Sequence, residues 1–73
     1  MKALVTKISE KNPCVVRIAV ISGDFVIASG WCKLSTAKKI DAEVEIPKGY
    51  LPEVKEGKNE LGQVFHKIEW KVA

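Results

Sequence analysis

The sequence predicts an all-β protein: one small domain over residues 1–73, folded as a five-stranded barrel that is closed or partly closed. The chain has 73 residues, of which 47% are apolar, and only 5 are glycine and 3 proline, as in a folded single domain. Apolar residues recur mostly with a period of two, and β-branched residues are abundant. Short apolar runs are separated by turn signals at regular intervals, which is typical of small β-barrels.

The first half of the chain predicts three strands. The first spans Lys2–Ile8, with Leu4, Thr6 and Ile8 expected on one face, and it ends at a polar stretch closed by a proline. A second strand is predicted over Cys14–Ile21. The tight-turn sequence Ser-Gly-Asp follows it, so the third strand, Phe25–Leu34, is expected to fold back antiparallel on the second.

The register of this hairpin decides where its cysteines lie. A three-residue loop pairs Ile21 with Phe25 and sets Cys14 opposite Cys32, whereas a two-residue Gly23-Asp24 loop separates them. Both registers are open from the sequence. The 18-residue spacing matches no zinc or redox motif, and we expect two buried, reduced thiols.

The middle of the chain predicts a turn and then a fourth strand. Ser35–Lys39 reads as a turn or a single helical turn, since its lysines suit a helix end rather than a start. Ile40–Ile46 alternates strictly between apolar and acidic residues and predicts a half-buried strand. Pro47–Gly49 ends it.

The C-terminal part predicts a hairpin. Tyr50–Glu56 is a strand interrupted by Pro52, which indicates an edge position. A long tip follows over 57–62, and the last strand spans Gln63–Val72. One face of that strand carries Val64, His66, Ile68, Trp70 and Val72. We expect Trp70 in the core, and His66 in the core or at an interface. An OB-fold-like barrel fits this layout, and an SH3-like barrel is the alternative.

Several function classes are not supported by the residues present. The longest apolar run, Ile18–Ile21, is far shorter than the ~20 residues of a membrane span, and no signal peptide is predicted. No phosphate-binding loop, nucleophile with a base, or metal motif occurs. Asp41, Glu43 and Glu45 read as a solvated face. We therefore expect no enzyme, no cofactor, no metal site, no membrane contact and no small-molecule substrate.

Charge and aromatic residues point instead to a binding surface. The net charge is +3, and lysines supply all cations except Arg17. On the third strand, the face with Ala28, Gly30 and Cys32 is expected to point inward. This leaves Phe25 and Trp31 outside near Lys33. Aromatic rings beside lysines on a strand are what a single-stranded nucleic acid needs, because bases stack and ammonium groups contact phosphates.

The chain resembles the small single-stranded DNA-binding (helix-destabilising) proteins of filamentous phages. The resemblance covers the size, the all-β layout and a C-terminal block: an acidic-hydrophobic strand, the turn Pro47–Tyr50, a hairpin, and the basic tail Glu69–Ala73. The resemblance implies an OB-type barrel and a homodimer that coats single-stranded DNA without sequence preference. It also implies a role in DNA replication in the cytoplasm, which is that of the host cell if the protein is phage-encoded. This chain has fewer Tyr and Arg residues than that family.

The leading hypothesis is a non-catalytic β-barrel homodimer that binds single-stranded DNA, or RNA. The candidate stacking residues are Phe25, Trp31, Tyr50 and Phe65. The candidate phosphate contacts are Arg17, Lys33, Lys48, Lys67 and Lys71. The alternative is a protein-interaction module, such as a phage or plasmid accessory protein, whose exposed aromatic residues contact a protein partner.

Overall fold

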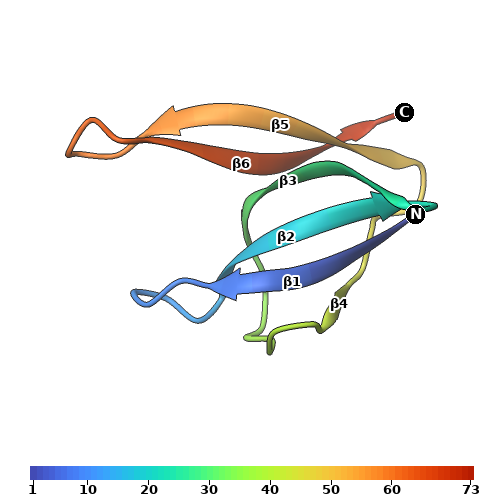
Figure 1. The fold of residues 1–73 in the computed structure, drawn as a ribbon, viewed down its shortest axis with the longest axis horizontal. Helices are drawn as coiled ribbons and strands as arrows, with labels where there is room; N and C mark the ends of the chain where they lie inside the picture. The colour runs from blue at the N-terminus through green and yellow to red at the C-terminus, as the bar shows by residue number, and fades with distance from the viewer.

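The computed structural model describes all residues 1–73, and it is all-β with no helix. Its strands are β1 (Lys2–Ile8), β2 (Val15–Ser22), β3 (Phe25–Lys33), β4 (Glu43–Val44), β5 (Tyr50–Lys58) and β6 (Val64–Val72). They form one open six-stranded sheet in the order β4-β1-β2-β3-β6-β5 (Figure 1). The chain contains no helix that could cross a membrane.

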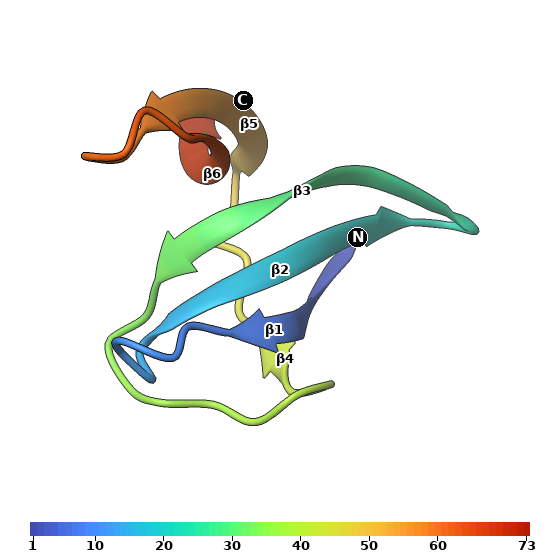
Figure 2. The same ribbon diagram turned by 60° about the vertical axis from the view of Figure 1, so that its left-hand side comes forward.

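The sheet has two parts, which meet at β3 and β6. Strands β1, β2 and β3 form an antiparallel meander, and β5 and β6 form an antiparallel hairpin. A short parallel contact, with Trp31 opposite Lys67, joins them. Figure 2 shows the hairpin nearly end-on above β3, so the sheet bends sharply at this contact. The loop between β1 and β2 and the tip of the β5–β6 hairpin lie at the same end of the molecule in both views (Figures 1 and 2).

The core lies on one face of the meander. Its fully or nearly fully buried residues are Ala3, Val5, Val16, Ile18, Val20, Ala28, Val44 and Ile68. Six of these eight come from β1, β2 and β3, and the hairpin contributes only Ile68. Trp70 packs against this cluster, as predicted. The prediction of a core position for His66 was wrong, because its side chain is 51% exposed.

A bulge in β1 corrects the predicted face of that strand. Val5 pairs with Ile18 but Lys7 pairs with Arg17, so Thr6 is an extra residue. The core face therefore carries Ala3 and Val5 before the bulge, and the prediction that Leu4 and Thr6 share a face with Ile8 was wrong. Beyond the bulge the parity reverses, and Ile8 packs against the core.

A second bulge corrects the start of β3. The β2–β3 loop has two residues, with Ser22 opposite Phe25, and the register shifts again between Val20 and Ile21. Ala28 and Gly30 face inward as predicted. Val26, however, is 61% exposed, because the extra residue moves it to the other face.

The same register settles the cysteines. Cys32 lies opposite Val16, and the amide of Leu34 donates to the carbonyl of Cys14 over 2.7 Å, so the two thiols are not opposite each other. Both are free and half-buried rather than fully buried. Burial raises the pKa of the Cys32 thiol above its ordinary value.

The strand predicted over Ile40–Ile46 was largely wrong, since only Glu43–Val44 is a strand. Asp41 adopts a left-handed backbone conformation (φ 68°), which interrupts the extended chain. Its amide donates to the carbonyl of Val5, and the Ala42 amide donates to that of Lys39. The alternation still places Val44 in the core, while Ile40 is 50% exposed.

Candidate nucleic-acid interface

A row of cations and one tryptophan crosses the outer face of the sheet. Pairing places Lys7 of β1 opposite Arg17 of β2, Arg17 opposite Trp31 of β3, and Trp31 opposite Lys67 of β6. Residues opposite each other in register point to the same face. Trp31 is therefore half-buried between cationic neighbours on both sides, on the face opposite the core.

The bulge in β1 is what brings Lys7 into this row. Without the extra Thr6, Lys7 would have the same parity as Ala3 and Val5 and would point into the core. The Thr6 hydroxyl donates to the carbonyl of Arg17 over 3.1 Å, so the bulge is tied to β2. A guanidinium nitrogen of Arg17 donates to the Ser29 hydroxyl over 3.4 Å, which holds the arginine along this face.

A shallow hollow lies beside Trp31. It is lined by Trp31, Lys7 and residues of the β1–β2 loop, including Glu10 and Lys11. Lys11 also lines a second hollow with Asn59, Glu60 and Leu61 at the hairpin tip. The two loops at this end of the molecule therefore flank the tryptophan, with Lys11 between them.

The hairpin tip is fixed by a single side chain. The Asn59 carboxamide oxygen accepts the amides of Leu61 and Gln63, each over 3.0 Å, and its nitrogen donates to the Gln63 side chain. Gly62 takes the left-handed conformation that closes the turn (φ 78°). One wall beside Lys11 is thus an ordered turn.

Phe65 lies two residues from Lys67 on the same face of β6. It is opposite Gly57, where an added Cβ would lie 2.7 Å from the end of the phenyl ring, so the ring rests directly on the β5 backbone. The ring remains 36% exposed. One ring face therefore packs on the protein while the side chain still reaches solvent.

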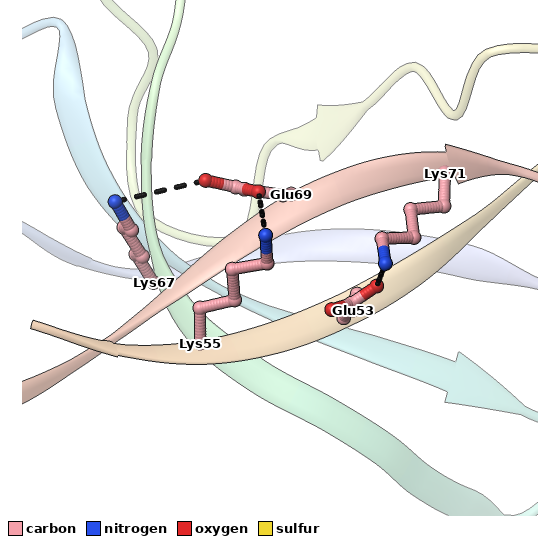
Figure 3. Close-up of polar contacts among 5 residues, drawn as sticks. All are labelled: Glu53, Lys55, Lys67, Glu69 and Lys71. Carbon is pink, nitrogen blue, oxygen red and sulfur yellow. Dashed lines mark ion pairs between the residues drawn. The ribbon is translucent and has the colours of Figure 1, made fainter.

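Carboxylates already occupy two of the predicted phosphate contacts (Figure 3). Lys67 lies 3.6 Å from a Glu69 oxygen, and Lys71 pairs with Glu53. Lys55 contacts Glu69 at 3.0 Å. The hydrogen bond from Lys55 lowers the pKa of Glu69, and the same bond raises the pKa of Lys55. These three lysines and two glutamates form an ion ladder along the outer face of the hairpin.

The cations of the meander have no such partners. No carboxylate lies within ion-pair distance of Arg17, Lys7, Lys11 or Lys33. Lys33 is exposed and lies two residues beyond Trp31 on the same face of β3. The positive charge that is free to meet an anion therefore lies around Trp31 and not on the hairpin.

Three predicted site residues lie elsewhere. Phe25 is 75% exposed, but the β3 bulge turns it to the opposite face from Trp31, about 20 Å along the strand at 3.3 Å per residue. Tyr50 pairs with Val72 on the other face of the hairpin from Lys67. Lys48 is exposed in the turn that precedes β5.

The structure thus gathers Arg17, Trp31, Lys33, Lys67 and Phe65, with Lys71 farther along β6. Lys7 and Lys11 were not among the site residues predicted from the sequence. Lys7 has no local signal, because only the bulge sets its direction. Lys11 could have been suggested by its place in a polar loop between two strands of the predicted barrel, where such folds bind oligonucleotides.

No three His, Cys, Asp or Glu side chains come together in a group that could hold a metal ion. No known protein family, no curated protein and no solved structure matches the chain.

Proposed function

We propose that this protein binds single-stranded nucleic acid, without catalysis, on the outer face of β2 and β3. The observation that carries the proposal is the position of Trp31 between Arg17 and Lys67, beside a hollow lined by Lys7 and Lys11. A base can stack on the indole while the unpaired cations around it, Arg17, Lys7 and Lys33, meet the phosphates. Because stacking and charge attraction do not read base edges, we expect the binding to be sequence-tolerant.

The strand arrangement supports an OB-type fold for this site. Five long strands run in the order β1-β2-β3-β6-β5, and β3 and β6 are parallel. OB-folds are partly open five-stranded barrels that bind oligonucleotides on the face of their second and third strands, between two loops. Trp31, the β1–β2 loop and the hairpin tip have this arrangement here.

The test is a titration of the tryptophan fluorescence with oligo-dT at two salt concentrations. Binding through the four unpaired cations, Arg17, Lys7, Lys11 and Lys33, should lower log K by about 3 per log unit of salt, at about 0.7 per phosphate neutralised. A salt-independent affinity would contradict the proposal. Oligo-rU in a parallel titration distinguishes RNA from DNA.

Two tryptophan variants separate the site from the core. Trp31→Ala should lower the affinity for oligo-dT by about 1–3 kcal/mol, the contribution of one stacked base, and should largely preserve the fold. Trp70→Ala should cost about 2–3 kcal/mol of stability, because its ring packs against the core, and should leave the affinity of the folded fraction unchanged. Equal melting of both variants would show that Trp31 is structural.

One observation favours a protein partner as the second candidate. The β2–β3 tip exposes Phe25 (75%), Val26 (61%) and Ile27 (50%) next to one another. Large exposed apolar side chains gathered at one tip mark an interaction surface, and a partner would enclose this tip because Phe25 and Val26 point to opposite faces. If oligonucleotides do not bind, an interaction through this tip becomes the leading function, and Phe25→Ser should abolish it.

A further inference from the structure

The two edges of the sheet are treated differently. On the β1 edge, Ala3 and Leu4 pair with β4, and Val5 exchanges backbone hydrogen bonds with the segment 41–42 at 2.8 and 2.9 Å. On the other edge, β5 (Tyr50–Lys58) pairs with β6 on one side, and no strand pairs with its second side (Figure 1). A free edge of this length is a template for another strand.

Two hydrogen bonds at the ends of the hairpin fix which groups face that free edge. The Ala73 amide donates to the Gly49 carbonyl, and the Asn59 amide donates to the Gln63 carbonyl. In an antiparallel ladder the hydrogen-bonded pairs alternate, so odd-numbered residues of β5 bond to β6. The even-numbered residues direct their backbone groups outward, and those with an amide that is free to donate are Val54, Glu56 and Lys58. The Tyr50 amide already donates to the Pro47 carbonyl over 3.1 Å, and Pro52 offers only its carbonyl.

Resting on the homodimer that the sequence predicts for the proposed function, we propose that a second copy of this chain pairs antiparallel with β5 across a two-fold axis at Val54. Val54 then lies opposite the partner's Val54, and both of its outward backbone groups are bonded. The Glu56 amide donates to the carbonyl of the partner's Pro52. Because Pro52 has no amide hydrogen, the return bond to the carbonyl of the partner's Glu56 is missing, and each strand lacks one hydrogen bond there.

Among the registers with the two-fold axis near the middle of β5, the charged side chains favour the one centred on Val54. With the axis at Val54, Glu53 lies opposite the partner's Lys55, and Lys55 lies opposite the partner's Glu53. An axis at Glu53, Lys55 or Glu56 would set two like charges opposite each other, and an axis at Pro52 would pair two residues without amide donors. Opposite charges across strands stabilise the pairing and like charges oppose it. The segment Glu53-Val54-Lys55 is thus self-complementary.

The pairing also extends contacts already present in one protomer. Glu53 and Lys55 belong to the ion ladder of the hairpin, with Lys71 and Glu69 as their partners (Figure 3). In the dimer the two ion ladders meet at Glu53 and Lys55 of each copy, so that each of these charges has an opposite charge of the partner beside it. On the opposite face, Val54 is 43% exposed and would be covered by the partner's Val54.

Charge reversal tests the register directly. Glu53→Lys or Lys55→Glu alone sets like charges opposite each other twice, and each should raise the dimer dissociation constant at least about tenfold in sedimentation velocity. A mixture of the two variants restores both opposite-charge pairs and should form a heterodimer close to wild-type strength. Glu45→Lys and Lys39→Glu, exposed positions outside β5, are the matched controls and should leave the dimer unchanged.

Three results would overturn the proposal: a wild-type monomer at high micromolar concentration, variants that dimerise like the wild type, or a mixture that fails to recover. Circular dichroism should show each variant folded, because the ion pairs lost within one protomer are solvent-exposed. Trp31 lies outside the β5 edge, so monomeric variants should still bind oligo-dT. Titration of these variants with oligo-dT therefore tests nucleic-acid binding separately from dimerisation. An extended peptide bound to β5 in place of a second copy would also leave the wild type monomeric.

Discussion

The meander and the hairpin are held together in different ways. The meander buries Val16, Ile18 and Val20 completely on one face, and its outer face carries Arg17 and Trp31. The hairpin fully buries only Ile68 and packs Trp70 against the core, and its remaining contacts are its backbone ladder and exposed ion pairs. Exposed ion pairs stabilise weakly compared with buried methyl groups.

This difference suggests a division of roles. A rigid meander holds the proposed stacking residue in one position, because Trp31 and the core share the same strands. The hairpin supplies one wall of the site and the free edge, and it is attached mainly through Ile68, Trp70 and the close approach at Gly30. We expect its amides to exchange faster with solvent than those of β2.

The largest expected effect comes from a matched pair of valine truncations, which tests whether the meander has a buried core that the hairpin lacks. Val16→Ala removes methyl groups from a fully buried position and should lower the free energy of unfolding by about 2–3 kcal/mol. Val64→Ala, at a position 53% exposed on the hairpin, should cost about 0.5 kcal/mol. Urea unfolding followed by circular dichroism measures both, and equal costs would show that the hairpin has a core of its own.

The junction of the two regions gives the next largest effect. A Cβ at Gly30 would lie 3.0 Å from the carbonyl oxygen of His66, which is backbone and cannot turn aside. Gly30→Ala should therefore push β6 away from β3 and cost about 1–3 kcal/mol. Hydrogen exchange should show β6 amides losing protection more than β2 amides, and uniform loss would mean that the two regions unfold together.

The ion ladder makes the hairpin sensitive to pH at both extremes. Glu69 has a lowered pKa in the folded protein, so its contribution is present above its ordinary value of 4.5 and is lost as pH falls through the lowered value. Lys55 has a raised pKa, so its contribution is present below 10.5 and is lost as pH rises through the raised value. Hydrogen exchange or NMR shifts of hairpin amides should follow both transitions.

A variant control isolates this effect. In Glu69→Gln, the NMR signals of the hairpin around Lys55 and Lys67 should lose their change at acidic pH. The meander amides should keep the pH dependence that they have in the wild type. If the acidic transition is unchanged in this variant, it arises from carboxylates other than Glu69.

The smallest predicted effect compares the two thiols. Burial raises the pKa of Cys32, which leaves less thiolate to react at neutral pH. Alkylation by iodoacetamide in the native state should therefore be slower at Cys32 than at Cys14, as measured by mass spectrometry of digests. Cys14→Ser gives the Cys32 rate alone, and a Cys32 rate as fast as that of an unfolded control would contradict its burial.

The sequence alone determined the all-β class, the turns and much of the strand layout. Alternation is a local property, and it correctly predicted the inward positions of Ala28 and Gly30 and the packing of Trp70. The proline at position 52 correctly predicted that its strand lies at an edge of the sheet. The turn at Pro47–Gly49 also followed from its residues, since Gly49 has a positive φ of 80°.

Only the tertiary structure decided which side chains share a face. The extra residue at Thr6 places Lys7 on the same face as Trp31. The extra residue at Ile27 places Phe25, which precedes it, on the opposite face from Trp31. The alternation over Ile40–Ile46 likewise gave only a two-residue strand, because the backbone at Asp41 turns to bond with Val5. Bulges and edge contacts depend on a partner strand distant in sequence, so no local pattern carries them.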